Sequence, residues 1–187
     1  RNNIFHDSIS YPKVSGGWGI YFDEGSSYIV AENNLVYNTS SGNLHQHYGK
    51  ENRVLNNIFA YSHGPQLRRS REEEHISFIL ERNIVYSNNE SMLGVHWDNG
   101  NYQLDANCYW SSFGPDLDFA GRDFQQWQAE GHDAQSIIAE PLFADPEHAD
   151  FRLAGDSPAL GLGFQPFDLS APGLYGEPGW VDKPKQI

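Results

Sequence analysis

The stretch Asn56-Asn57-Ile58-Phe59 decides the fold, because variants of it return throughout residues 1–112. In each copy an asparagine precedes a short apolar segment. The residue before this asparagine is a further asparagine in three copies, an arginine in one and an alanine in one. The copies are Asn2-Asn3-Ile4-Phe5, Asn33-Asn34-Leu35-Val36, Asn56-Asn57-Ile58-Phe59, Arg82-Asn83-Ile84-Val85 and Ala106-Asn107-Cys108-Tyr109. The second asparagine recurs after 31, 23, 26 and 24 residues. Self-similarity at a period of roughly 20–30 residues is typical of a solenoid, in which each repeat buries its apolar face on its neighbours.

The repeated segment favours strands over helices. It is β-rich and bounded by polar turns, which predicts coils of parallel β-structure. Asparagine suits the corner of such a coil, because it tolerates left-handed backbone and its side-chain amide can bond to the amide one coil further on. We therefore predict an all-β, right-handed parallel β-helix with one stacked corner, formed by Asn34, Asn57, Asn83 and Asn107.

Aliphatic residues also align in columns when the copies are superimposed. The position after the corner asparagine and the position three before it are apolar in every full copy: Ile4, Leu35, Ile58, Ile84 and Cys108 at the first, and Ala31, Val54, Leu80 and Leu104 at the second. Neighbouring coils lie about 4.8 Å apart, so like residues stack into a continuous core. Cys108 is therefore expected to be a buried, inert hydrophobe, and without a second cysteine the chain forms no internal disulfide.

Composition limits the classes of function. At 187 residues the chain is expected to form one domain. Lys and Arg number 12 against 25 Asp and Glu, a net charge of −13, which disfavours nucleic acid and acidic membrane surfaces as partners. No apolar run reaches membrane-spanning length, and no signal peptide is visible. Because the chain opens at Arg1 inside a repeat, we expect a further β-helix segment to precede it.

Residues 113–187 differ from the coils of residues 1–112. The segment 123–128 predicts a short helix, with Asp123 as N-cap, Gln126 at N3 and Gly131 as terminator. The remainder is punctuated by proline and is expected to be an extended tail that packs along or over the last coil. Residues 71–74 are expected to form a charged loop that leaves the longest coil.

The segment 19–26 before the first full repeat, together with the motifs of the tail, resembles a known group of proteins. The tail motifs are Pro141-Leu142-Phe143, Asp145-Pro146, Asp150-Phe151-Arg152-Leu153 and Ser157-Pro158-Ala159-Leu160. With them the chain resembles the C-terminal part of bacterial right-handed parallel β-helix carbohydrate-active proteins of the pectate-lyase-like superfamily, and is similar to the family 141 glycoside hydrolases. The resemblance spans nearly the whole chain and implies a polysaccharide ligand and a secreted or periplasmic protein. It does not specify the reaction, since the scaffold serves hydrolases, lyases and binding modules.

Counting back from the corner asparagines locates a strand with many titratable side chains. Eleven and ten residues before Asn34, Asn57 and Asn107 stand the pairs Asp23 and Glu24, Gln46 and His47, and His96 and Trp97. Stacked coils would bring these positions to one groove wall, a few sugar units long. The residues expected to bind substrate there are Tyr21, His45, His47, Arg69, His96, Trp97 and Asp98. The alternative is a solvated sheet face, which would favour Thr, Ser and Lys and carry less His and Trp.

Glycoside hydrolysis needs two carboxyl groups, about 5–5.5 Å apart for retention and about 6.5–9.5 Å apart for inversion. Asp23 and Glu24 are adjacent, so only one of them can easily face the groove. Asp98 is expected three coils away, too far for a direct pair. The partner is therefore sought among the loop acids at 72–74, with Glu72 as the candidate, although a solvated charge run explains these acids equally well.

Three functions stay open. The preferred one is a glycoside hydrolase that acts on a plant cell-wall polysaccharide such as xylan. The second is a non-catalytic carbohydrate-binding module, and the third is a polysaccharide lyase, in which Arg68, Arg69 or Lys50 would neutralise a uronate. His45 and His47 share a strand face and could bind sugar hydroxyls or a metal. We predict no metal and no cofactor.

Overall fold

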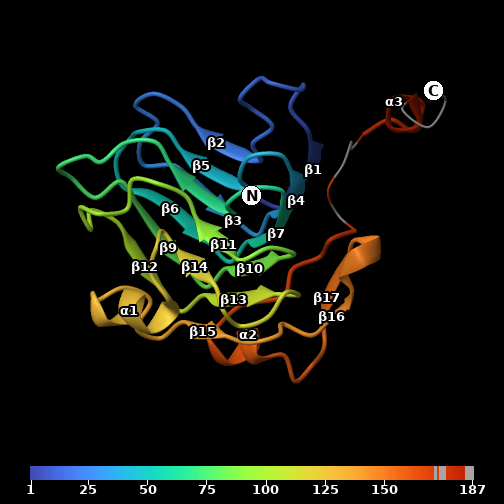
Figure 1. The fold of residues 1–187 in the computed structure, drawn as a ribbon. Helices are drawn as coiled ribbons and strands as arrows, with labels where there is room; N and C mark the ends of the chain where they lie inside the picture. Colours follow the sequence, from blue (N-terminus) through green and yellow to red (C-terminus); the bar gives the residue numbers. More distant parts are fainter. Residues whose placement is uncertain (171, 173–175, 184–187) are drawn as a thin grey trace.

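The chain winds into a parallel β-solenoid of about four turns (Figure 1), as the repeats predict. The computed structural model describes residues 1–170, 172 and 176–183. Three sheets form the walls. Sheet A contains β1 (Ile4–Ser8), β4 (Leu35–Thr39), β7 (Ile58–Ser62), β10 (Ile84–Ser87), β13 (Cys108–Ser111) and β15 (Ile137–Ile138). Sheet B contains β2 (Ile20–Phe22), β5 (Leu44–Gln46), β8 (Leu67–Arg69), β11 (Ser91–Leu93) and β14 (Asp118–Phe119). Sheet C contains β3 (Val30–Glu32), β6 (Asn52–Leu55), β9 (Phe78–Glu81) and β12 (Gln103–Asp105).

The elements after the coils are short. They are α1 (Phe124–Ala129), the antiparallel pair β16 (Phe143–Asp145) and β17 (Asp150–Leu153) with the 3-10 turn η1 (Pro146–His148) between them, α2 (Pro158–Gly161) and α3 (Pro178–Val181). Helix α1 is capped as predicted: the Asp123 side chain accepts from the backbone of Gln126, and the Gln126 side chain accepts from the backbone of Asp123. None of the helices in the described residues is long and apolar enough to cross a membrane.

The predicted corner is a ladder of side-chain amides between sheets C and A. Asn34 Nδ2 donates to Asn57 Oδ1 at 2.8 Å, and the same bond joins Asn57 to Asn83 at 2.9 Å and Asn83 to Asn107 at 3.1 Å. The residue before each ladder asparagine adopts the left-handed conformation. Its φ is 55° at Asn33, and the four equivalent residues have similar values. The two residues of the motif therefore divide the two roles between them: the first makes the turn and the second makes the ladder.

The ladder ends on a buried carboxylate. Asn107 Nδ2 donates to Asp133 Oδ1 at 3.1 Å, while the backbone N–H of Asn107 donates to Ser136 Oγ at 2.8 Å. Trp127 Nε1 also donates to Asp133, at 2.8 Å. The sequence placed the end of the coils at residue 112, yet sheets A and B each gain one further strand, β15 and β14. At the start of β15, Asp133 and Ser136 take the place of the next corner asparagine.

The two apolar columns are buried in different layers. One column contains Ala31, Val54, Leu80 and Leu104, which stand three residues before the ladder asparagines. It lies inside the solenoid with Val36, Phe59, Val85 and Tyr109. The column that includes Ile58 and Cys108 faces the outside of sheet A, where Phe151, Ala159 and Phe164 of the tail cover it. Cys108 is buried as predicted, and burial raises the pKa of its thiol to about 12.

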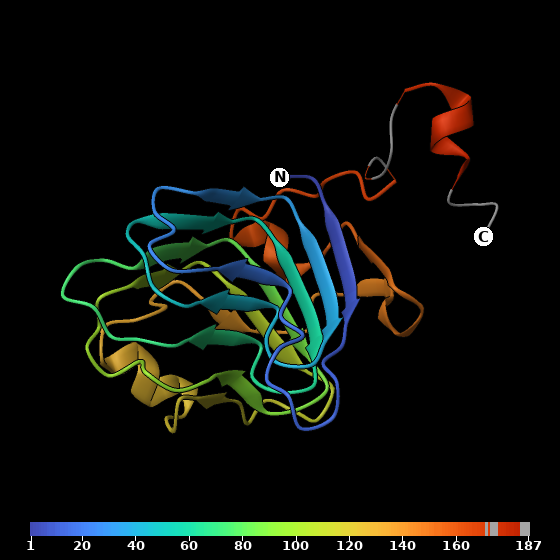
Figure 2. The same cartoon turned by 90° about the horizontal axis from the view of Figure 1, so that it is seen from above.

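The tail extends further than predicted. After β17 it runs back over sheet A (Figures 1 and 2), and the backbone of Gln165 both donates to and accepts from the Asn56 side chain, each at 2.7 Å. The sequence predicted that the tail packs along or over the last coils. The reach back follows from the apolar outer column of sheet A, which needs cover on every coil.

Candidate functional site

The outer face of sheet B gathers aromatic and titratable side chains around β2 and β5. The strand register aligns Tyr21 with His45 and His45 with Arg68, so these three side chains form one outward column. The ring of Trp18 stacks on Tyr21 with centroids 4.7 Å apart and contacts His45 at 4.9 Å. His45 Nε2 is bonded to Ser70 Oγ. We call Trp18, Tyr21 and His45 the aromatic stack.

The aromatic stack holds a neutral histidine and two unpaired polar atoms. Burial lowers the pKa of His45 to about 4, and the positive charges of Arg68 and His47 add to that effect. Within the described residues His45 Nδ1 and Trp18 Nε1 are buried and have no hydrogen-bond partner. A buried polar atom left unpaired costs roughly 1–3 kcal/mol, so a small ring movement that exposed either atom to a ligand hydroxyl would be favoured.

Two carboxylates lie at the edge of the aromatic stack. The Tyr21 hydroxyl donates to Asp23 Oδ1 at 3.0 Å. The backbone N–H of Glu24 and then this hydroxyl lower the pKa of Asp23, which keeps it ionised. Glu24 Oε1 lies 3.7 Å from His47 Nε2, and the His47 ring packs 5.2 Å from that of Tyr48. Both Asp23 and Glu24 are exposed, so both can reach a ligand on this face.

The loop acids are bonded elsewhere. Glu72 Oε1 accepts the backbone N–H of Asp98 at 2.9 Å, and Glu73 Oε2 accepts that of Gly49 at 3.0 Å. Asp98 itself is paired with Arg122 at 2.9 Å. Glu72 and Glu73 are thus each held by a backbone N–H of another segment, and the pairing of Asp23 with a loop acid stays a prediction.

Further along sheet B the outer face sinks into a depression of about 390 Å³. Gly94 follows Arg68 in the outward column, since Leu67 pairs with Leu93, and its missing side chain opens the surface. His96 and Asp98, both predicted to bind substrate, line this depression and are exposed. The candidate site therefore runs from the aromatic stack past Arg68 to the depression.

Two of the predicted binding residues are buried, although Trp97 borders the depression. Arg69 is 2 % exposed and donates inward, to the His96 carbonyl at 3.0 Å and to Ser77 Oγ at 3.0 Å. Trp97 is also 2 % exposed, and its ring packs edge-on against Phe78 in the core. Counting back from the corner aligned Asp23 with Gln46, whereas Gln46 pairs with Phe22. A slip of one residue turns every side chain to the other face of a strand.

Trp18 was not predicted to belong to the site, and Arg68 was named only as a residue that could neutralise a uronate. Arg68, not Arg69, is the arginine of the outer face. Trp18 stands before β2 between two glycines, and a Cβ at Gly19 would lie 2.5 Å from the Asn43 carbonyl oxygen. This close approach holds the chain against the next coil and places the Trp18 ring over the sheet. A tryptophan flanked by glycines directly before a strand is the signal that could have identified it.

Comparisons with protein-family models, with curated proteins and with solved structures gave no match. Among the described residues no group of three His, Cys, Asp or Glu side chains is placed to hold a metal ion.

Proposed function

We propose that this protein binds a polysaccharide along the outer face of sheet B. The observation that carries the proposal is the aromatic stack with its two unpaired polar atoms, His45 Nδ1 and Trp18 Nε1. A sugar ring has apolar C–H faces and polar hydroxyl edges. It therefore matches a site in which aromatic rings stand beside hydrogen-bonding groups. The Tyr21 ring, 37 % exposed, is the surface on which a sugar would stack.

The length and charge of the face indicate the kind of polymer. Five strands spaced about 4.8 Å apart make a surface roughly 19 Å long, enough for a few sugar units. The net charge of −13 and the exposed Asp23 and Glu24 disfavour a polyuronate, and so a lyase reaction. A neutral plant cell-wall polysaccharide such as xylan, suggested by the sequence resemblance, agrees with these charges.

Glycoside hydrolysis is the second candidate function. It is favoured by Asp23, an exposed and ionised carboxylate held by the Tyr21 hydroxyl beside the aromatic stack. An ionised carboxylate can act as nucleophile or base, and a second carboxyl must act as acid. Glu24, which is exposed and next to Asp23 in the sequence, is the other candidate, whereas Glu72 is bonded to the backbone of Asp98.

The binding proposal is tested by calorimetry with xylohexaose. Tyr21→Ala is expected to weaken affinity by about 1–3 kcal/mol, the range seen when a contact anchor is truncated. Tyr11→Ala is the matched control, because Tyr11 is 84 % exposed and takes no part in the aromatic stack. A folded Tyr21→Ala variant with the affinity of the parent protein would remove the aromatic stack from the binding site.

Catalysis is tested by release of reducing ends from xylan. Asp23→Asn or Glu24→Gln keeps the shape of the side chain and removes its acid–base chemistry, so one of them should lower turnover by at least about 10²-fold. Binding of xylohexaose should be retained. Binding without turnover in the parent protein would leave the binding module as the function, and absorbance from an unsaturated product would indicate a lyase.

A further inference from the structure

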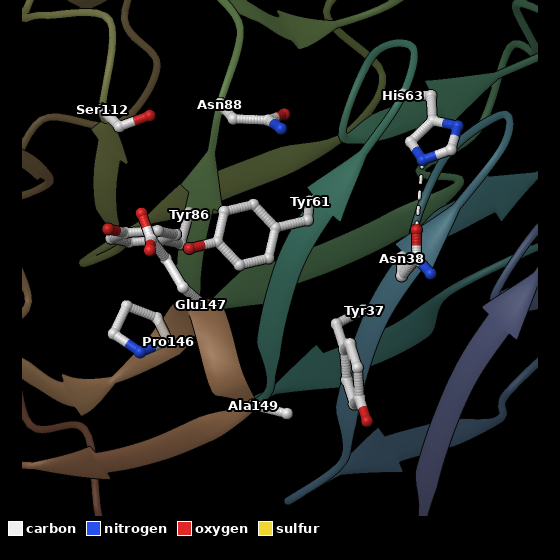
Figure 3. Close-up of a pocket in the computed structure, with 10 residues that line it drawn as sticks. All are labelled: Tyr37, Asn38, Tyr61, His63, Tyr86, Asn88, Ser112, Pro146, Glu147 and Ala149. Atoms are coloured by element: carbon white, nitrogen blue, oxygen red, sulfur yellow. Dashed lines mark hydrogen bonds between the residues drawn. The ribbon is translucent and has the colours of Figure 1, made fainter.

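A second pocket lies on the outer face of sheet A, on a different wall of the solenoid from the candidate site. It has a volume of about 400 Å³, within the range of small-molecule sites. Strands β4, β7 and β10 supply its floor, and η1 supplies a side wall through Pro146 and Glu147 (Figure 3). Its lining includes the side chains of Tyr37, Tyr61, Tyr86, His63, Asn88 and Glu147.

Tyr61 is the centre of this tyrosine pocket. Figure 3 shows its ring between those of Tyr37 and Tyr86. The Tyr61 and Tyr86 rings meet edge-on with centroids 5.3 Å apart. Tyr37 packs 5.4 Å from Phe151 of the tail. These contacts fix the rings before any ligand arrives, which lowers the entropic cost of binding.

The small residue Ala60 leaves room for the pocket. In the register of sheet A it pairs with Tyr37 on one side and Tyr86 on the other. Two large rings are thus separated by a methyl group, and the next residue, Tyr61, turns its ring over that gap. The pocket is a consequence of this large–small–large order along one column.

The backbone of Tyr61 is unfavourable for a tyrosine. Its φ is 55°, in the left-handed region, and the residues at the same place in the two preceding coils are Asp7 and Asn38, with φ of 55° and 53°. Aspartate and asparagine adopt this conformation readily, whereas a bulky residue pays of order 1 kcal/mol or more. The Tyr61 ring is only partly buried, so core packing does not require it. An unfavourable backbone that holds a partly exposed aromatic ring in a pocket points to function.

The polar groups of the pocket select the ligand. They are amides, hydroxyls, one imidazole and the single carboxylate of Glu147, and no Lys or Arg is among the described lining residues. His63 Nε2 lies 3.1 Å from Asn38 Oδ1, so the imidazole is oriented at the rim (Figure 3). An anionic ligand would find no cationic side chain here. A neutral molecule with flat apolar faces and many hydroxyls would find both aromatic rings and hydrogen-bonding partners.

We propose that the tyrosine pocket is a second carbohydrate-binding site, which takes a neutral oligosaccharide independently of the outer face of sheet B. The ring of Tyr61 is its stacking surface. Asn88, His63 and Glu147 are placed around that ring to bond sugar hydroxyls. Two sites on two walls of one rod would let the protein hold two chains, or two parts of one chain, at the same time.

The test uses Tyr61→Asn in the Tyr21→Ala background, with calorimetric titration of xylohexaose and cellohexaose. Asparagine keeps the left-handed backbone without strain, so the variant should be as stable as its background or more so. Affinity for at least one hexaose should fall at least about tenfold. Tyr28→Asn is the matched control, because Tyr28 has φ of 60°, is 65 % exposed and lies outside the pocket.

The outcomes separate the two sites. If Tyr21→Ala alone abolishes binding of both hexaoses, the tyrosine pocket is overturned and the site on sheet B stands. If binding survives Tyr21→Ala unchanged and is lost with Tyr61→Asn, the pocket stands and the proposed function of sheet B fails. An equal loss with Tyr28→Asn, or no binding of either hexaose to the parent protein, also overturns the pocket.

Discussion

The asparagine corner and the outer face of sheet B are built on the same coils but follow opposite rules. At the corner, Asn34, Asn57 and Asn83 repeat one side chain with one set of hydrogen bonds. On sheet B the outward column changes at every coil, from Tyr21 to His45 and on to Arg68. Repetition serves the fold, since a ladder needs identical partners. The fold does not require the outward residues of sheet B to differ from coil to coil, so these positions are free to carry the side chains of a binding site.

The two regions also treat buried polar groups differently. Every corner amide between Asn34 and Asn107 is bonded to the next one, whereas the aromatic stack keeps His45 Nδ1 and Trp18 Nε1 buried and unpaired within the described residues. Satisfied groups contribute to stability, and unsatisfied groups cost it. If this contrast is right, substitutions at the corner should change stability, and substitutions on the outer face should change binding.

The largest effect is expected at the centre of the ladder. Asn57→Ala removes donors to the Ala31 and Leu55 carbonyls and to Asn83, and it leaves Asn34 without its acceptor. Several buried groups lose partners at once, so urea denaturation should show a loss of about 4 kcal/mol. Asn3→Ala, at the exposed end of the same ladder, should cost less than about 1 kcal/mol. Equal losses at both positions would contradict the ladder as a source of stability.

The next effect concerns two neighbouring arginines. Arg69→Met removes a buried guanidinium bonded to the His96 carbonyl and Asn99, and should cost about 3 kcal/mol by urea denaturation. Arg68→Met, on the outer face, should cost less than about 1 kcal/mol. Oligosaccharide affinity should respond in the reverse order. A stability loss at Arg68 that matched the loss at Arg69 would mean that the two faces of β8 are assigned wrongly.

A smaller effect should appear on acidification. The pKa of His45 is lowered from 6.5 to about 4 in the folded protein, so the unfolded chain takes up the proton first as pH falls. The stability due to neutral His45 is fully present above pH 6.5 and is lost between 6.5 and 4, by about 2 kcal/mol at pH 5. His45→Gln should flatten this slope in urea denaturation at several pH values. Burial also lowers the pKa of His132, so a weaker slope should remain.

The smallest effect is expected at Cys108. Its thiol is 1 % exposed and its pKa is raised to about 12, so the reactive thiolate is scarce in the folded protein. A thiol reagent should label it only as fast as the protein unfolds. Labelling of the native protein at the rate of a free thiol would show that the tail does not cover sheet A.

The corner was predictable because its signal is local and repeated. Two residues of the motif determine the turn and the ladder, and the apolar residues on either side determine which faces are buried. The capping box of α1 is equally local, since Asp123 and Gln126 satisfy each other. Such signals do not depend on how long the neighbouring segments are.

The face of sheet B was harder to predict because its register depends on loop length. Residues 23–29 join β2 to β3, whereas the shorter segment 47–51 joins β5 to β6, so counting from the corner slips by one residue. Of the two arginines named in the next coil, Arg68 belongs to the outward column and Arg69 does not. Trp97 was misplaced because the segment from β11 to β12 turns inward and buries its ring against Phe78. The tyrosine pocket had no signal in the repeat, because Tyr61 occupies a position where its equivalents are Asp7 and Asn38.

The asparagine ladder also has a direction. Each side-chain amide from Asn34 to Asn107 donates a hydrogen bond toward the coil that follows. The last of these bonds is accepted by Asp133. Asp133 accepts this hydrogen bond through Oδ1, and among the described residues no further corner amide follows it, so Asp133 is the stopper of the ladder. If a coil were inserted between Asn57 and Asn83, its corner asparagine would accept a hydrogen bond from Asn57 and donate one to Asn83. Such solenoids can therefore lengthen by duplication of whole coils while the same stopper is kept at the end.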